Sequence, residues 1–301
     1  MMQAYLWRLI CVCCLLGGIS LPSQAKIIIS AEHDSPAVRS FAHELIQALP
    51  KHVINYMPRA QLEAKQQFSA DTQLILLGPA LLKWRLQFTQ STPATLIMQV
   101  SRVQAYQQLS NQRPQHLTFL WSDPPVERQL ALLKAMQPDA KNIGVLYGNH
   151  SSFLTKEVEQ AAQAENLTLH KYYWPDSHDA RSLARLLNKT DALLGLDDLD
   201  IYNPTTIKSI LLSSYARKQA LIGPTAAFIK AGSLSSTYSD KEDWLHSLQA
   251  LLKTPADTWP HSVYPTEYKV LINPQVARSL GIQGSRPTQL LKQIKRYRYA
   301  P

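Results

Sequence analysis

The chain has 301 residues, a formal net charge of +9 and three cysteines, all of which lie between residues 11 and 14. The rest of the chain therefore has no cysteine, which excludes disulfides, thiolate nucleophiles and cysteine metal sites there. A chain of this length buries a large core without disulfides. After the first 25 residues, no apolar stretch is long enough to span a bilayer.

Residues 1–25 have the pattern of a secretory signal peptide. Arg8 supplies the positive charge, LICVCCLLGGIS forms a short apolar segment, and SQA ends in small residues at Ala25. We therefore expect a periplasmic protein whose mature chain begins near Lys26. The alternative is an uncleaved membrane anchor, for which the apolar segment is short.

In the first half of the chain, apolar runs of strand length alternate with segments of helical period. The spacing of Val38, Phe41, Leu45 and Leu49 predicts a helix over 35–49. The unbroken apolarity of QLILLGP indicates a strand that is buried on both faces. Strands are expected at KIIIS (26–30), HVINYM (52–57), QLILLGP (73–79), ATLIMQV (94–100) and HLTFLWS (116–122), with less regular helices near 58–68 and 79–90.

The second half repeats the alternation more regularly. Strands are expected at NIGVLYG (142–148), LTLHKYYW (167–174), DALLGL (191–196), ALIGP (220–224), SLSSTYS (233–239) and YKVLI (268–272), with helices over 151–165, 179–188, 204–218 and 226–232. This order predicts an α/β protein with two Rossmann-like lobes, each on a parallel central sheet with right-handed crossovers.

Two strands end in a polar residue that precedes a proline. Asp123 and Asn203 are favoured N-cap types, and a proline at the next position fits the first helical turn. The acidic turn of Asp197, Asp198 and Asp200 therefore lies between the carboxyl end of a strand and a helix. In open α/β sheets, ligands bind at that edge, so we interpret the turn as bordering a ligand cleft.

Several segments resemble the ABC-transporter substrate-binding proteins of the tryptophan/tyrosine-binding type, which share the type I periplasmic binding fold. The segments are SDPPVERQLALLKAMQPDAKNIGVLYGNHSS (122–152), DALLGLDDLDIYNPTTIKSILLSSYARKQALIGPTAAFIKAGSLSSTYS (191–239) and YKVLINPQVARSLGI (268–282), with a weaker trace in SAEHDSPAVRSF. The resemblance implies two lobes that are joined by a three-segment hinge and close on a ligand. The crossings are expected near 122–125, near 236–240 and in the proline-containing stretch before Tyr268.

The same resemblance divides the chain. Lobe 1 is expected over 26–122 plus about 238–262, and lobe 2 over 123–237 plus about 263–290. The basic run KQIKRYRYAP forms most of a tail expected over 291–301. We interpret this tail as solvated, with contact to anionic lipid or nucleic acid as the alternative.

In such a fold, the ligand contacts come from the carboxyl ends of the strands. Asp197 or Asp198 accepts from an ammonium group or a sugar hydroxyl, and Tyr147 or Tyr202 stacks on a flat ligand. Backbone N–H groups after Gly78 and Gly223 could hold a carboxylate. The candidate residues are Ser30, Glu32, His33, Gly78, Asp123, Tyr147, Asp197, Asp198, Tyr202, Thr225 and Thr237. For each of them the alternative is a cap, a turn or a solvated loop.

The function that the resemblance implies is capture of a small polar ligand, amino acid-like or other, for an ABC importer. A ligand-sensing envelope protein that signals to a membrane partner is the alternative, and an exported enzyme is a third. The sequence has no glycine-rich phosphate loop, no paired metal histidines and no nucleophile elbow. The acidic turn also lacks the glycine and the distal glutamate of a calcium loop. We expect a monomer without catalytic residues, cofactor, metal or nucleic acid, whose partners are the ligand and an ABC permease or other inner-membrane protein.

Overall fold

The computed structural model describes residues 26–69, 71–88, 92–109, 114, 116–175, 179–282 and 286–294. The expected signal peptide at 1–25 and the end of the expected tail, 295–301, lie outside these ranges. Within them, no helix combines the length and the apolar character that crossing a membrane requires.

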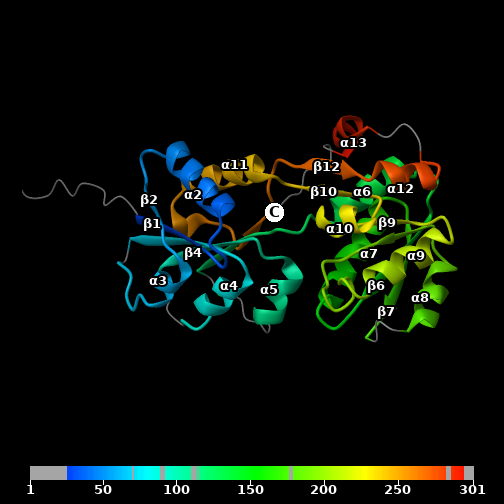
Figure 1. The fold of residues 1–301 in the computed structure, drawn as a ribbon, viewed down its shortest axis with the longest axis horizontal. Coiled ribbons are helices and arrows are strands. Elements are labelled where there is room, and N and C mark those ends of the chain that lie inside the picture. Colours follow the sequence, from blue (N-terminus) through cyan, green and yellow to red (C-terminus); the bar gives the residue numbers. More distant parts are fainter. Residues whose placement is uncertain are drawn as a thin grey trace, which may run out of the picture.

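The first lobe is built on a six-stranded parallel sheet with the order β11-β5-β4-β3-β1-β2 (Figure 1). Its strands are β1 (Lys26–Ala31), β2 (Val53–Tyr56), β3 (Thr72–Leu77), β4 (Ala94–Met98), β5 (Leu117–Leu120) and β11 (Ser262–Val263). Its helices are α2 (Pro36–Ala48), α3 (Arg59–Glu63), α4 (Pro79–Arg85), α5 (Arg102–Leu109) and α11 (Lys241–Leu252), with a short 3-10 turn η2 (Ala256–Thr258).

Helices cover both faces of this sheet, which explains why its strands are apolar without alternation. Successive side chains of a strand point to opposite faces. Ile27 and Ile29 therefore pack with α2 and α11, whereas Ile28 packs with α3 and α4 on the other face. Figure 1 shows these two layers of helices above and below the strands.

The second lobe has a six-stranded sheet with the order β12-β10-β9-β8-β6-β7, in which β12 runs antiparallel to β10 and the other pairs are parallel. Its strands are β6 (Asn142–Tyr147), β7 (Thr168–Tyr173), β8 (Ala192–Leu194), β9 (Ala220–Ile222), β10 (Ser235–Tyr238) and β12 (Lys269–Ile272). Its helices are α6 (Val126–Met136), α7 (Thr155–Ala164), α8 (Ala180–Leu187), α9 (Ile207–Tyr215), α10 (Ala227–Ala231), α12 (Pro274–Ser279) and α13 (Pro287–Ile294), with the 3-10 turn η1 (Ser152–Leu154) before α7.

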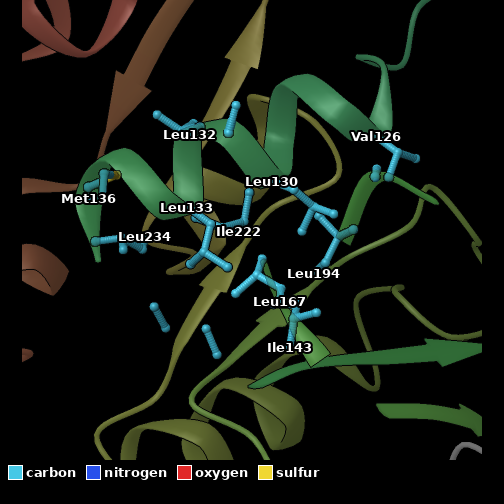
Figure 2. Close-up of a cluster of buried hydrophobic side chains, with 14 of the residues drawn as sticks. Val126, Leu130, Leu132, Leu133, Met136, Ile143, Leu167, Leu194, Ile222 and Leu234 are labelled. Carbon is cyan, nitrogen blue, oxygen red and sulfur yellow. The ribbon is translucent and has the colours of Figure 1, made fainter. Parts of the chain in front are cut away.

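Helix α6 is the apolar anchor of the second lobe. Leu130 and Leu133 are fully buried and belong to the same hydrophobic cluster as Ile143 and Ile222 of the sheet. Figure 2 shows these side chains between the helix and the strands beneath it. Because α6 follows the first crossing from lobe 1, this packing fixes where the crossing enters lobe 2.

The chain passes between the two sheets three times, over residues 121–125, 239–240 and 264–268. The predicted fold class, two α/β lobes on parallel central sheets, is therefore confirmed. Several element boundaries differ from those expected, and two of them bear on the second lobe. Helix α9 begins at Ile207, because the Asn203 side chain caps a turn that precedes it by accepting from the backbone N–H groups of Thr205 and Thr206. Helix α13 packs on α6 and β12, so its end at Ile294 falls within the range expected as a tail.

Candidate ligand site between the lobes

Ser101 and Arg102 lie where β4 ends and α5 begins. Gln104 donates its backbone N–H to the Ser101 hydroxyl at 3.3 Å, and Ser101 donates its backbone N–H to the Gln104 side chain at 3.0 Å. This reciprocal pair is a capping box. This capping box holds Ser101 and Arg102 at the carboxyl edge of the first sheet.

Asp123 lies on the first crossing and is buried, with 6% of its surface exposed. Its carboxylate accepts from the Arg102 backbone N–H at 2.9 Å and from the Arg102 Nε at 3.2 Å. The Asp–Pro pair predicted that Asp123 caps its own helix, and this prediction is wrong, because α6 begins only at Val126. Strands β4 and β5 are neighbours, so the end of β5 brings Asp123 to the first turn of α5 instead.

Asp197 follows β8 in the second lobe and is partly buried. Its carboxylate is hydrogen-bonded to the Ser101 hydroxyl across the lobe boundary. Burial, together with the negative charges of Asp123 and Asp198, raises the pKa of Asp197 to about 6. Among the described residues, no cation forms an ion pair with Asp197, because the nearby Arg102 pairs with Asp123 and Glu157.

A small cavity of about 20 Å³ lies where these groups meet. Such a volume holds about one water molecule. Its lining comes from both lobes and from the first crossing: Arg102, Asp123, Pro124, Val126, Gln129, Leu154, Leu194, Gly195, Leu196, Asp197 and Pro224. In this conformation the cavity has no room for a larger ligand, so the junction must open if such a ligand is to reach Asp197 at this point.

A second cavity of about 250 Å³ lies on lobe 1, between the first turns of α2 and α11 and the carboxyl ends of β3 and β4. Apolar side chains such as Phe41 and Trp244 form its floor, and Gln99 is exposed at its edge with a left-handed backbone, φ 55°. The lining residues are Ala37, Val38, Phe41, Leu77, Met98, Gln99, Ser239, Asp240, Lys241 and Trp244. Sequence reasoning missed this cavity, because the helical period assigned Val38 and Phe41 to the core.

Of the other candidates of lobe 1, Glu32 and Gly78 meet at the start of α4. Glu32 accepts from the Ala80 backbone N–H at 2.9 Å, and a Cβ on Gly78 would come within 2.9 Å of the Glu32 Cβ. His33 is exposed, with its Nε2 3.5 Å from the Glu32 carboxylate. Ser30 is fully buried, and its hydroxyl has no hydrogen-bond partner.

Asp198 and Tyr202 organise the acidic turn from inside. Asp198 is fully buried and accepts from the Ser151 hydroxyl at 2.5 Å and from the Asp200 backbone N–H at 3.1 Å. Tyr202 is 1% exposed, and its hydroxyl donates to the Leu194 carbonyl at 3.4 Å. Both side chains are thus occupied by contacts that shape the turn on which Asp197 lies.

The remaining candidates of lobe 2 are not among the lining residues of the small cavity. Thr237 is fully buried and donates both its N–H and its hydroxyl to Gln129 at 2.9 Å. Tyr147 is partly exposed with its ring tilted against Tyr173, and Thr225 is also partly exposed. Of the eleven candidates, the structure brings only Asp123 and Asp197 to the lining of one cavity. Within the described ranges, no group of three or more His, Cys, Asp or Glu side chains is placed to hold a metal ion.

Two positions that sequence reasoning missed, Arg102 and Glu157, complete this junction. Arg102 opens α5 after the carboxyl end of β4, which is the pattern that identified Asp123 and Asp197, whereas Glu157 lies in the first turn of α7, beyond the turn η1. The negative charges of Asp123 and Glu157 outweigh the effect of burial and raise the pKa of Arg102 above its ordinary value. The junction is therefore an acidic cluster around one arginine.

Comparison with known proteins identifies a family. Residues 91–294 match the family model described as ABC transporter substrate binding protein. A sequence search among curated proteins gives no match.

Solved structures with the same fold cover most of the chain. A conserved domain protein from Vibrio cholerae is 18% identical with a TM-score of 0.55, over 90% of this chain and 98% of that chain. An ABC domain in complex with L-Trp from Streptococcus pneumoniae is 19% identical with a TM-score of 0.56, over 90% and 98%. A ligand-free, open substrate binding protein with adhesive properties from Clostridium difficile is 17% identical with a TM-score of 0.63, over 87% and 96%.

Proposed function

The chain belongs to the ABC transporter substrate binding protein family, and on this premise we propose that it captures a small polar ligand between its lobes for an ABC importer. We also propose that the protein works in the periplasm. We propose the same division as before, with lobe 1 over 26–122 plus about 238–262 and lobe 2 over 123–237 plus about 263–290. The family is one of binding proteins, and in the proposed function this protein holds its ligand without converting it.

The observation that supports this function is the carboxylate of Asp197 at the lobe boundary. It accepts from one hydroxyl, that of Ser101, and has no ion-pair partner among the described residues. A buried charge without a counter-ion is costly. An ammonium or hydroxyl group of a ligand would supply the missing donor, and lobe closure would strengthen that hydrogen bond by excluding water.

The larger cavity suggests where the rest of such a ligand lies. Its floor of Phe41 and Trp244 is apolar, whereas its edge carries the amide of Gln99. Its volume of about 250 Å³ is just below the range of about 300–1,000 Å³ of drug-sized ligand pockets. A compact ligand with one apolar group fits these properties. Because the Streptococcus pneumoniae structure holds L-Trp, amino acids are the first ligands to test.

The first experiment identifies the ligand by mass spectrometry of small molecules released when protein purified from periplasm is denatured. We expect a compound with an amino or hydroxyl group, whose affinity is then measured by calorimetry. An empty protein that shows no thermal shift with amino acids, nucleosides or sugars would contradict the proposal.

The second experiment replaces the proposed acceptor. Asp197→Asn should weaken ligand binding by roughly tenfold or more, since a hydrogen bond to a charged group contributes about 1.5–3 kcal/mol. The matched control is Asp200→Asn in the same turn, where the carboxylate is exposed and pairs with His150. Equal affinities for the two variants would remove Asp197 from the site.

A further inference from the structure

Lobes 1 and 2 touch through α5 on one side and the η1–α7 segment on the other. Arg102 donates to both oxygens of the Glu157 carboxylate, at 2.7 and 2.6 Å. The rings of Tyr106 and Phe153 stack with centroids 4.4 Å apart and an interplanar angle of 19°. These contacts, together with the Ser101–Asp197 hydrogen bond, close the junction over a cavity of about 20 Å³.

Arg102 is held from the hinge side as well as from lobe 2. Its backbone N–H and its Nε bind Asp123 on the first crossing, and its guanidinium lies 5.5 Å from the centroid of the Tyr264 ring on the third. These partners belong to the segments about which the lobes would turn. Glu157 instead belongs to α7 of lobe 2, so its bond to Arg102 is the ion pair that must break, along with the Ser101–Asp197 and Tyr106–Phe153 contacts, when the lobes part.

The surroundings of the Arg102–Glu157 pair make it stronger than an ion pair at the protein surface. The side chain of Arg102 is 11% exposed and that of Glu157 is 28% exposed, so salt and water screen the pair less than a surface pair. Both oxygens of Glu157 accept from one guanidinium nitrogen. By contrast, Glu159 of the same helix pairs with Lys171 of β7, and these side chains are 48% and 37% exposed, the setting in which ion pairs contribute little.

We propose that the Arg102–Glu157 pair is a latch that holds the ligand-free lobes together and sets the ratio of closed to open molecules. In this latch, Asp123 keeps Arg102 in place, and Arg102 separates from Glu157 when the lobes open. The inference rests on the proposed function, since it describes how that ligand site opens. A ligand enters only the unlatched molecules, and the latch re-forms behind it.

The test uses Glu157→Gln in the ligand-free full chain, with Glu159→Gln as the matched control on the same helix. The glutamine keeps the size of the side chain, and Arg102 keeps its partner Asp123, so we expect the unfolding temperature to change little. The ratio of closed to open molecules should fall by roughly tenfold or more. Small-angle X-ray scattering should then give a larger radius of gyration for Glu157→Gln and an unchanged one for the control.

A second variant covers the case in which the wild-type protein is so strongly closed that a tenfold change is invisible. Glu157→Gln combined with Phe153→Ala removes the ring stack as well and should open the molecule further. If both variants keep the wild-type radius of gyration, the latch is refuted. Because these measurements use no ligand, a failed latch leaves the proposed function standing, and a failed ligand search leaves the latch testable.

Discussion

The acidic residues at the junction differ in how many donors the protein gives them. Asp123 accepts from a backbone N–H and a guanidinium, and Asp198 accepts from a hydroxyl and a backbone N–H. Asp197 accepts from the Ser101 hydroxyl alone and has its pKa raised to about 6, mainly by burial. Of the three, Asp197 therefore has the most capacity left for a donor from outside the protein.

Gly78 shows that one residue can be required by the backbone rather than by a ligand. Its φ is 106°, and an added Cβ would meet the Glu32 Cβ at 2.9 Å. We expect Gly78→Ala to lower the free energy of unfolding by about 1–3 kcal/mol for the strain alone, and by more because of the contact. Gly281→Ala is the control, because Gly281 also has a positive φ, 72°, but nothing within 4 Å of the added Cβ. Denaturant unfolding of both variants measures the difference, and equal losses would contradict the role of Glu32.

At the scale of single residues, the sequence predicted part of the junction. Asp123 and Asp197 were found because each follows an apolar strand, and the carboxyl ends of parallel strands meet at one edge. Arg102 follows β4 in the same way, whereas Glu157 lies inside α7, and their pairing depends on how the two lobes face each other. Periodicity within one lobe carries no information about that orientation.

Whole elements were easier to predict than their ends. The strands of both sheets are covered on two faces, so their apolar runs are unbroken and plain in the sequence. The helix expected near 58–68 is only the five-residue α3, Arg59–Glu63, because too few turns exist there for a period to show. The start of α9 was misplaced because Asn203 caps a separate turn before the helix.

The position of α6 depends on one buried glutamine as well as on its leucines. Gln129 is 2% exposed, donates to the Gly223 carbonyl at 2.8 Å and to the Ser236 hydroxyl at 3.0 Å, and accepts from Thr237. It thereby ties the helix to β10 and to the loop after β9, next to the small cavity.

Replacing this glutamine should destabilise the second lobe. Gln129→Leu strands the Thr237 N–H and the Gly223 carbonyl in the core, at about 1–3 kcal/mol for each unsatisfied group. We expect a loss of about 2–6 kcal/mol in the free energy of unfolding. Gln137→Leu, just past the end of α6, removes a side-chain oxygen that is buried without a partner and should be neutral or stabilising. Thermal and denaturant unfolding would separate the two, and similar stabilities would argue against Gln129 as an anchor.

At the scale of the whole molecule, charge and shape at the junction act together. Most of each lobe's core lies in its own hydrophobic clusters, with Val103 of α5 reaching into the cluster around α6. The junction between the lobes also carries ion pairs and hydrogen bonds. Polar contacts of this kind are readily replaced by contacts with water or with a ligand. A receptor that closes on its ligand needs this property. The ion pair of Arg102 favours closure, and the charge of Asp197 opposes it.

This opposition makes the closed state depend on pH. The closed junction raises the pKa of Asp197 from 3.8 to about 6, whereas parted lobes would return this carboxyl group to water and toward its ordinary value. The closed state therefore binds a proton more tightly than the open state. The contribution of Asp197 therefore does not oppose closure below about pH 4, opposes it progressively more between about pH 4 and pH 6, by a few kcal/mol at most, and is constant above that range.

Small-angle scattering of the ligand-free protein between pH 4 and pH 8 measures this dependence. We expect the radius of gyration to rise with pH through that interval, because Ser101 is the one donor to Asp197 found among the described residues and both Asp123 and Asp198 repel its charge. Asp197→Asn carries no charge at any pH and should flatten this profile, whereas Asp200→Asn in the exposed part of the turn should keep it. If Asp197→Asn retains the wild-type profile, another group controls closure. A ligand ammonium would do above pH 6 what the proton does below it, so adding the ligand should remove the same dependence.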